Sequence, residues 1–88
     1  MDNTTKTTVK RVMLNDVTNL KTFVAVTETF DFDVDLRSST NSRYVIDAKS
    51  ILGCMSLDLS KPCICEVHET GAAADAYFKA IGHLIVGV

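Results

Sequence analysis

One seven-residue segment, FDFDVDL at positions 30–36, alternates apolar and acidic residues without a break and constrains the fold more than any other feature. Successive side chains of a β-strand point to opposite faces of a sheet, so the pattern predicts a strand that is buried on one face only. The predicted inner face carries Phe30, Phe32, Val34 and Leu36, and the outer face carries Asp31, Asp33 and Asp35. A chain of 88 residues can bury one small core, so we expect a single domain over residues 1–88 with one sheet face in water.

The rest of the chain is predicted to supply three more strands and three helices. Strands are predicted over 8–14, 43–47 and 63–69, and helices over 17 to 28 or 29, 51–58, and 71 to about 86. The turn-rich residues 37–42 join the second and third strands as a hairpin with a loop of several residues. The resulting βαββαβα order predicts an α+β fold in which three helices cover one face of a four-stranded antiparallel sheet.

The first two helices are each preceded by a residue that favours a helix N-cap. Asn15 or Asp16 can accept hydrogen bonds from the free N–H groups of the first helix, and Ser50 can do so for the second. Apolar residues recur at helical spacing in the first and third helices, so each is expected to pack one face on the sheet. These residues are Val17, Leu20, Phe23 and Val24 in the first helix, and Ala73, Ala76, Tyr77, Ala80, Ile81 and Leu84 in the third.

The balance of charge gives no reason to expect a nucleic acid or a membrane as a partner. The 9 basic and 11 acidic residues leave a net charge of −2, which does not attract polyanions. No apolar stretch approaches the roughly 20 residues that span a bilayer, and the N-terminal residues lack the apolar core of a signal peptide. The three cysteines, an odd number, suit a reducing compartment better than a disulfide framework, so we expect a cytoplasmic protein.

Neither the acidic strand nor the cysteines have the spacing of a metal site. Acidic residues two apart on a strand lie about 6.5–7 Å apart, and no calcium-loop glycine accompanies them. Cys63 and Cys65 lack the spacing of a zinc knuckle, and His68 is expected to face away from Cys65, so the cysteines are predicted to lie in the core. The sequence also contains no nucleotide-binding glycine loop, nucleophile elbow or paired-carboxylate hydrolase motif. We therefore predict no metal, no cofactor and no enzymatic activity.

Two segments, AKSILGCMSL at 48–57 and TFVAVTETFDFDVDL at 22–36, resemble the HPr family, the small histidine phosphocarriers of the bacterial phosphoenolpyruvate-dependent sugar phosphotransferase system. The first is similar to the segment around the regulatory serine of this family in Gram-positive bacteria. The second is similar to the first helix and second strand of the family. The resemblance implies an open-faced β-sandwich in βαββαβα order, with Ser50 at the position of the regulatory serine.

The carrier histidine of this family is absent from its expected position. In the family it lies at the N-cap of the first helix and is followed by an arginine and a proline; these positions correspond here to Asp16, Thr18 and Asn19. The two histidines of the chain, His68 and His83, fall on the predicted fourth strand and last helix. Asp16 has three interpretations: a helix cap, a fixed charge that imitates a phosphorylated carrier residue, or an aspartate that is itself phosphorylated. The missing histidine implies that phosphocarrier activity has been lost.

The resemblance favours a regulatory or adaptor protein that is phosphorylated on Ser50. One form of HPr, which serves catabolite repression, also lacks the carrier histidine, keeps the serine and binds a transcription regulator when that serine is phosphorylated. Ile51, Leu52 and Met55 match apolar residues that contact partner proteins in the family, and one short helix cannot bury all of them. The implied partners are a serine kinase and either a transcription regulator or a component of the phosphotransferase system.

Two alternatives remain open. The first is a phosphocarrier with a non-standard acceptor, either Asp16 or His68. The second is an HPr-like fold used purely as a protein-binding module, without phosphorylation. In that second case Leu52→Asp is expected to abolish partner binding, whereas Ser50→Ala is expected to leave it unchanged.

Overall fold

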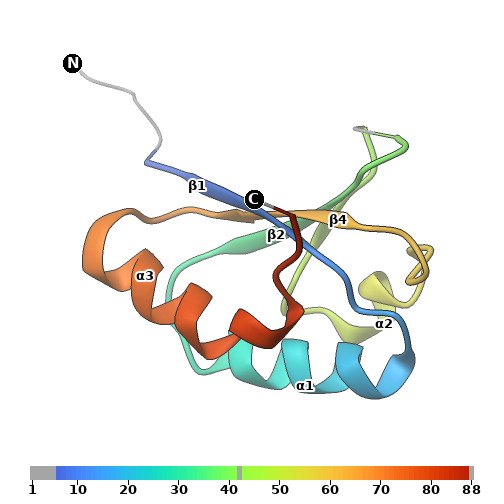
Figure 1. The fold of residues 1–88 in the computed structure, drawn as a ribbon, viewed down its shortest axis with the longest axis horizontal. Coiled ribbons are helices and arrows are strands. Elements are labelled where there is room, and N and C mark those ends of the chain that lie inside the picture. Colours follow the sequence, from blue (N-terminus) through green and yellow to red (C-terminus); the bar gives the residue numbers. More distant parts are fainter. Residues whose placement is uncertain (1–5, 42, 88) are drawn as a thin grey trace.

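A computed structural model describes residues 6–41 and 43–87 of the chain (Figure 1). The elements are β1 (Thr8–Val12), α1 (Val17–Glu28), β2 (Val34–Ser38), β3 (Val45–Asp47), α2 (Ile51–Cys54), β4 (Cys63–Val67), α3 (Gly71–Ala80) and the 3-10 helix η1 (Gly82–Leu84). The predicted βαββαβα order is therefore confirmed.

The four strands form one antiparallel sheet in the order β1-β4-β2-β3. The central strand β4 pairs with β1 on one side and with β2 on the other, so that Cys65 lies opposite both Lys10 and Leu36. The hairpin of β2 and β3 places Leu36 opposite Ile46. The helices lie together on one face of the sheet (Figure 1). The structure thus confirms the predicted α+β open-faced β-sandwich.

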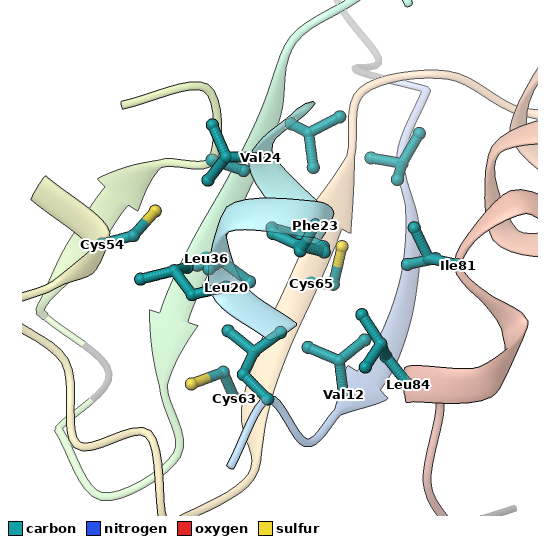
Figure 2. Close-up of a cluster of buried hydrophobic side chains, with 14 of the residues drawn as sticks. Val12, Leu20, Phe23, Val24, Leu36, Cys54, Cys63, Cys65, Ile81 and Leu84 are labelled. Atoms are coloured by element: carbon teal, nitrogen blue, oxygen red, sulfur yellow. The ribbon is translucent and has the colours of Figure 1, made fainter. Parts of the chain in front are cut away.

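The hydrophobic core fills the space between the sheet and the helices. Figure 2 shows Leu20 and Phe23 of α1 close to Leu36 and Cys65 of the sheet. Strand β4 buries every second residue, Cys63, Cys65 and Val67, because strand side chains alternate between the two faces. This arrangement explains why the alternating sequence patterns identify the inner face of the sheet correctly.

All three cysteines are buried free thiols, as predicted. Burial raises the pKa of Cys54 to about 11 and the pKa of Cys65 to about 12, and it also raises the pKa of Cys63. A thiol must ionise before it reacts as a nucleophile, so these three groups are unreactive while the core is closed.

The alternating segment forms a shorter strand than its sequence predicts, because β2 begins at Val34 rather than at Phe30. Phe30 and Phe32 precede the strand and pack beside Tyr77 of α3, their ring centroids lying 5.2 and 6.0 Å from the Tyr77 ring. The chain leaves α1 through a turn in which the Phe30 N–H donates to the Thr27 carbonyl at 3.1 Å. This turn directs the two phenylalanines toward α3 instead of into the sheet.

The third helix ends earlier than predicted and turns a different face to the sheet. It stops at Ala80 and is followed by η1, after which Ile85 forms a bridge with Val12 of β1. Tyr77, Ile81 and Leu84 are buried as predicted, whereas Ala73, Ala76 and Ala80 are exposed, and Ala74 and Phe78 are buried in their place. The large side chains of Tyr77 and Phe78 determine the buried face, because they remove more apolar surface from water than alanines do.

Other element boundaries differ by a few residues. The first strand ends at Val12 rather than at residue 14, and α2 covers Ile51–Cys54 rather than residues 51–58. The predicted turn at 37–42 contains Ser42, which lies outside the described residues, and β2 continues to Ser38 before it. The α2 helix ends early because the Ser56 N–H donates to the Gly53 carbonyl at 3.1 Å, a tighter turn than an α-helix makes.

Candidate functional site at the starts of the first two helices

Asp16 caps the first helix with its carboxylate. Its Oδ1 accepts a hydrogen bond from the Asn19 N–H at 2.8 Å, and its backbone is extended, as is usual for an N-cap. The Asn19 side chain also donates to the Leu14 carbonyl at 2.8 Å, across the start of the helix. The sequence prediction of a cap at this position is confirmed, and the carboxylate remains exposed to solvent.

A strained turn precedes this cap. Asn15 has a φ of 71°, in the left-handed region that non-glycine residues seldom adopt. The Asp16 N–H donates back to the Leu14 carbonyl at 2.8 Å, which closes a γ-turn around Asn15. The Asn15 N–H donates to the Leu59 carbonyl at 2.9 Å. The start of α1 is therefore tied to the connection between α2 and β4.

The connection between α2 and β4 is held in place by hydrogen bonds to the carboxylate of Asp58. Asp58 accepts hydrogen bonds from the Ser60 hydroxyl at 2.6 Å and from the Ser60 N–H at 3.1 Å. These bonds hold the pKa of Asp58 below its usual value, because they stabilise the ionised form. The turn presents the Leu59 carbonyl to Asn15, so it supports the start of α1.

Ser50 caps the second helix with its hydroxyl, as predicted. Its Oγ accepts from the Gly53 N–H at 3.2 Å, and its carbonyl accepts from the Cys54 N–H at 2.9 Å. The Ser50 residue is exposed. The short helix that it begins lies near the N-terminal end of α1 (Figure 1).

The apolar residues that follow Ser50 divide between the core and the surface. Cys54 and Leu57 are buried, and Ile51 is partly buried against the core. Leu52 and Met55 remain 80% and 49% exposed, respectively. Neighbouring exposed apolar side chains are a common feature of protein-binding surfaces.

One neighbour of this surface was missed by the sequence analysis. The Tyr44 hydroxyl, which belongs to the hairpin between β2 and β3, donates a hydrogen bond to Ser56 Oγ after α2. Tyr44 is 39% exposed and thus contributes an aromatic surface beside α2. No local pattern indicates this contact, because it joins residues on two different elements.

His68 lies immediately after β4 on the open face of the sheet, with its Nε2 2.8 Å from Asp35 Oδ2. It lines a shallow cavity of about 390 Å³ together with Asp33, Asp35 and Asp47. His83 is exposed on η1. The sequence pattern predicts a solvent-facing His68. It does not predict the contact with Asp35, because that contact depends on how β4 pairs with β2.

Two kinds of feature are absent from the part of the chain that the structure describes. Within residues 6–41 and 43–87, no group of three or more histidine, cysteine, aspartate or glutamate side chains is arranged to hold a metal ion. Among the helices of the same residues, none is both long and apolar enough to cross a bilayer.

The fold is a small open-faced β-sandwich of the kind expected for an HPr-like phosphocarrier. Residues 19–86 match the family described as "PTS HPr component phosphorylation site". The chain therefore belongs to the HPr family of the phosphotransferase system, whose members are carriers rather than enzymes and interact with other proteins of that system. No curated protein and no solved structure gives a significant match. The matched range includes Ser50 and begins just after Asp16 and Thr18.

Proposed function

We propose that this chain is an HPr-like regulatory or adaptor protein of the phosphotransferase system, that it performs no histidine phosphotransfer, and that it is phosphorylated on Ser50. The observation that carries this proposal is the carboxylate cap of α1. Asp16 occupies the helix start at which the family resemblance places the carrier histidine, and it uses Oδ1 to accept the Asn19 N–H at 2.8 Å.

The chemistry at the start of α1 explains why phosphotransfer is not expected there. A phosphocarrier needs an imidazole nitrogen that accepts a phosphoryl group and later releases it to another protein. It also needs cationic groups and N–H groups that stabilise the phosphate. Asp16 supplies a negative charge instead, and Thr18 stands where the resemblance places an arginine. The fixed charge of Asp16 would repel an incoming phosphoryl donor.

The geometry at Ser50 supports a modification site. The residue is exposed and lies at the N-terminus of α2, where a phosphate would interact favourably with backbone N–H groups. Lys49 is held away by its own partner, since its Nζ donates to the Phe30 carbonyl at 2.7 Å. We therefore expect a phosphate on Ser50 to interact mainly with the backbone N–H groups of α2 rather than with this cation.

The exposed side chains of Leu52 and Met55 support a partner-binding role for the same helix. They lie within five residues of Ser50, so one partner can contact both the serine and the apolar side chains. Ile51 contributes less to this surface because it packs partly against the core. We expect the partners to be a serine kinase and a transcription regulator or another phosphotransferase component, in the cytoplasm.

The surroundings of His68 argue against a carrier role for this histidine. Asp33, Asp35 and Asp47 line the same cavity, and their charges oppose the approach of a phosphoryl donor. The hydrogen bond to Asp35 also occupies Nε2. The open face of the sheet is therefore a poor place for phosphate transfer.

The proposal is tested by two phosphorylation reactions on the purified full chain. One contains ATP and a serine kinase specific for HPr, and the other contains phosphoenolpyruvate and the first enzyme of the phosphotransferase system. Intact and peptide mass spectrometry then locates any phosphate. We expect one phosphate on Ser50 in the first reaction and none in the second. Ser50→Ala should abolish the modification, whereas Ser60→Ala should retain it.

The other outcomes decide between the alternatives. Phosphate on Asp16 or His68 in the second reaction would overturn the proposal and identify an unconventional carrier. Absence of phosphate in both reactions, with an ordinary HPr modified in parallel, would overturn it in favour of a binding module without phosphorylation.

A further inference from the structure

A chain of hydrogen bonds runs from the hydroxyl of Ser50 to the ring of Tyr44. The Gly53 N–H donates to Ser50 Oγ at 3.2 Å, and the Gly53 carbonyl accepts from the Ser56 hydroxyl at 2.6 Å. The Tyr44 hydroxyl then donates to Ser56 Oγ. Gly53 thus joins the helix cap at Ser50 to the hairpin between β2 and β3.

The direction of these bonds is fixed by the number of available hydrogens. A serine hydroxyl has one hydrogen to donate and lone pairs to accept with. Ser56 uses its hydrogen on the Gly53 carbonyl, so it receives the hydrogen of Tyr44. The Tyr44 hydroxyl, the Ser56 hydroxyl and the Gly53 carbonyl form a continuous relay, so these two hydrogen bonds polarise one another. The Gly53 N–H belongs to the preceding peptide group, so Ser50 is coupled to this relay through the position of the Gly53 backbone.

Gly53 has little room to move without disturbing its surroundings. A Cβ at this position would lie 2.9 Å from Ile46 Cγ2 and 3.2 Å from Ser50 Oγ. The backbone of α2 is thus pressed against β3 on one side and against the cap on the other. A displacement of Gly53 caused by a change at Ser50 must therefore be shared with the groups bound to Gly53, and Ser56 is one of them.

We propose that Tyr44 is a positioning residue of the Ser50 surface: the state of the Ser50 hydroxyl sets the position of the Tyr44 ring through Gly53 and Ser56. When ATP transfers its γ-phosphoryl group to Ser50 Oγ, ADP leaves, the hydroxyl proton is lost, and Oγ becomes an ester oxygen. The Gly53 N–H then turns toward a phosphate oxygen, which moves the Gly53 carbonyl, then the Ser56 hydroxyl and finally the Tyr44 ring that is bonded to it.

This inference deepens the proposed function, since it assumes that the surface around Ser50 is the one that partners recognise. It adds an aromatic side chain from a different element to that surface. A partner that distinguishes the two states of Ser50 would therefore contact Tyr44 as well as Met55, and its pocket would accept an exposed aromatic ring.

The sequence offers a direct test, because the chain contains two tyrosines and no tryptophan. In protein labelled with ¹³C-tyrosine, the ring signals of Tyr44 and of the buried Tyr77 are compared by NMR in the wild type and in Ser50→Ala. The same comparison is made between Ser56→Ala and the double variant Ser50→Ala/Ser56→Ala. Ser60→Ala serves as the matched control, because the Ser60 hydroxyl binds Asp58 outside this chain of bonds.

We expect Ser50→Ala to shift the Tyr44 ring signals and to leave those of Tyr77 in place. The shift should fall to less than half when Ser56 is already alanine, and Ser60→Ala should cause none. An unchanged Tyr44 in Ser50→Ala, or an equal shift with and without the Ser56 hydroxyl, would overturn the coupling.

A phosphorylation experiment distinguishes failure of this inference from failure of the proposed function. If the serine kinase leaves Ser50 unmodified while Ser50→Ala still moves the Tyr44 signals through Ser56, the regulatory proposal fails and the coupling stands. If Ser50 is phosphorylated and the Tyr44 signals do not respond, the coupling fails and the regulatory proposal stands.

Discussion

The first helix begins at a carboxylate and the second at a hydroxyl, and the two starts differ in how firmly the protein holds them. Asp16 accepts its capping hydrogen bond at 2.8 Å, whereas Ser50 accepts its own at 3.2 Å. The first cap starts a helix of 12 residues with four buried side chains, and the second starts a helix of 4 residues with one, Cys54. An N-cap residue therefore begins a well-anchored helix in α1 and a weakly anchored helix in α2.

This difference matches the chemistry available at the two positions. A carboxylate gives α1 a permanent negative charge that complements the helix dipole, so nothing at that start needs to change for the helix to be stable. A serine hydroxyl is neutral and is a substrate for kinases. A reversible change in charge has more effect on a short helix with few core contacts, because less packing energy opposes a local rearrangement.

The largest expected difference between the two regions concerns local opening. Cys54 lies in α2 and Cys65 in the central strand β4, and both thiols are buried with raised pKa values. Each can be alkylated only after the structure around it opens. Opening of α2 breaks few contacts, so we expect iodoacetamide to modify Cys54 about a hundredfold faster than Cys65 at pH 8, which corresponds to about 2.7 kcal/mol. Peptide mass spectrometry over time measures both rates, and equal rates would show that α2 opens only when the whole protein unfolds.

Close packing at Gly53 is expected to give the next largest effect. A methyl group there would approach Ile46 Cγ2 to 2.9 Å, so Gly53→Ala forces α2 away from β3. Overpacking of this kind costs about 1–3 kcal/mol, partly offset by about 1 kcal/mol of improved helix propensity. We expect a net loss of up to about 2 kcal/mol in the free energy of unfolding, measured with urea.

Gly82 provides the matched control for that substitution. It has no heavy atom within 4 Å of an added Cβ, so Gly82→Ala should be neutral or stabilise the protein by about 0.4–1 kcal/mol. Equal losses in the two variants would indicate that contact with Ile46 is unimportant and that α2 has room to move.

Removal of the carboxylate cap should have a smaller effect. Asp16→Ala leaves the Asn19 N–H without its acceptor, and N-cap replacements of this kind cost about 1 kcal/mol. Asp16→Asn keeps an acceptor and removes the charge, so it should recover most of this loss in urea denaturation. If both variants lost the same amount, the charge of Asp16 rather than its hydrogen bond would be what stabilises α1.

The sequence predicted well those features that depend on local chemistry. Alternation identified the inner faces of β2 and β4. Residue type identified Ser50 as one cap and narrowed the other to Asn15 or Asp16, of which the structure shows Asp16, because a cap is satisfied by N–H groups only a few residues away. The predicted fold followed from the order of the elements. The same local patterns placed all three cysteines in the core.

The sequence did not predict features that depend on contacts between distant elements. Phe30 and Phe32 fit the alternating pattern, yet they leave the sheet because Tyr77 of α3 offers them an aromatic contact. The pairing of His68 with Asp35 requires the register of β4 against β2, and the Tyr44 contact requires the hairpin to reach α2. Periodicity carries no information on such pairings, since it describes one element at a time.

Removal of the weaker cap, Ser50, should cause the smallest loss of stability. This expectation is the most direct test of the comparison between the two helix starts. Ser50→Ala removes an acceptor that lies 3.2 Å from the Gly53 N–H at an exposed position, where water can replace the hydroxyl. Only one turn of helix depends on this bond, so we expect a loss of about 0.5 kcal/mol, near the lower end for N-cap replacements. Urea denaturation of Ser50→Ala and Asp16→Ala in parallel, with Ser39→Ala as a control for loss of an exposed serine hydroxyl, measures the difference. A loss in Ser50→Ala equal to that in Asp16→Ala would contradict the distinction between a firmly held start and a loosely held one. It would also mean that a phosphate on Ser50 acts on an element as stable as α1, and that its influence must then come from charge rather than from movement of α2.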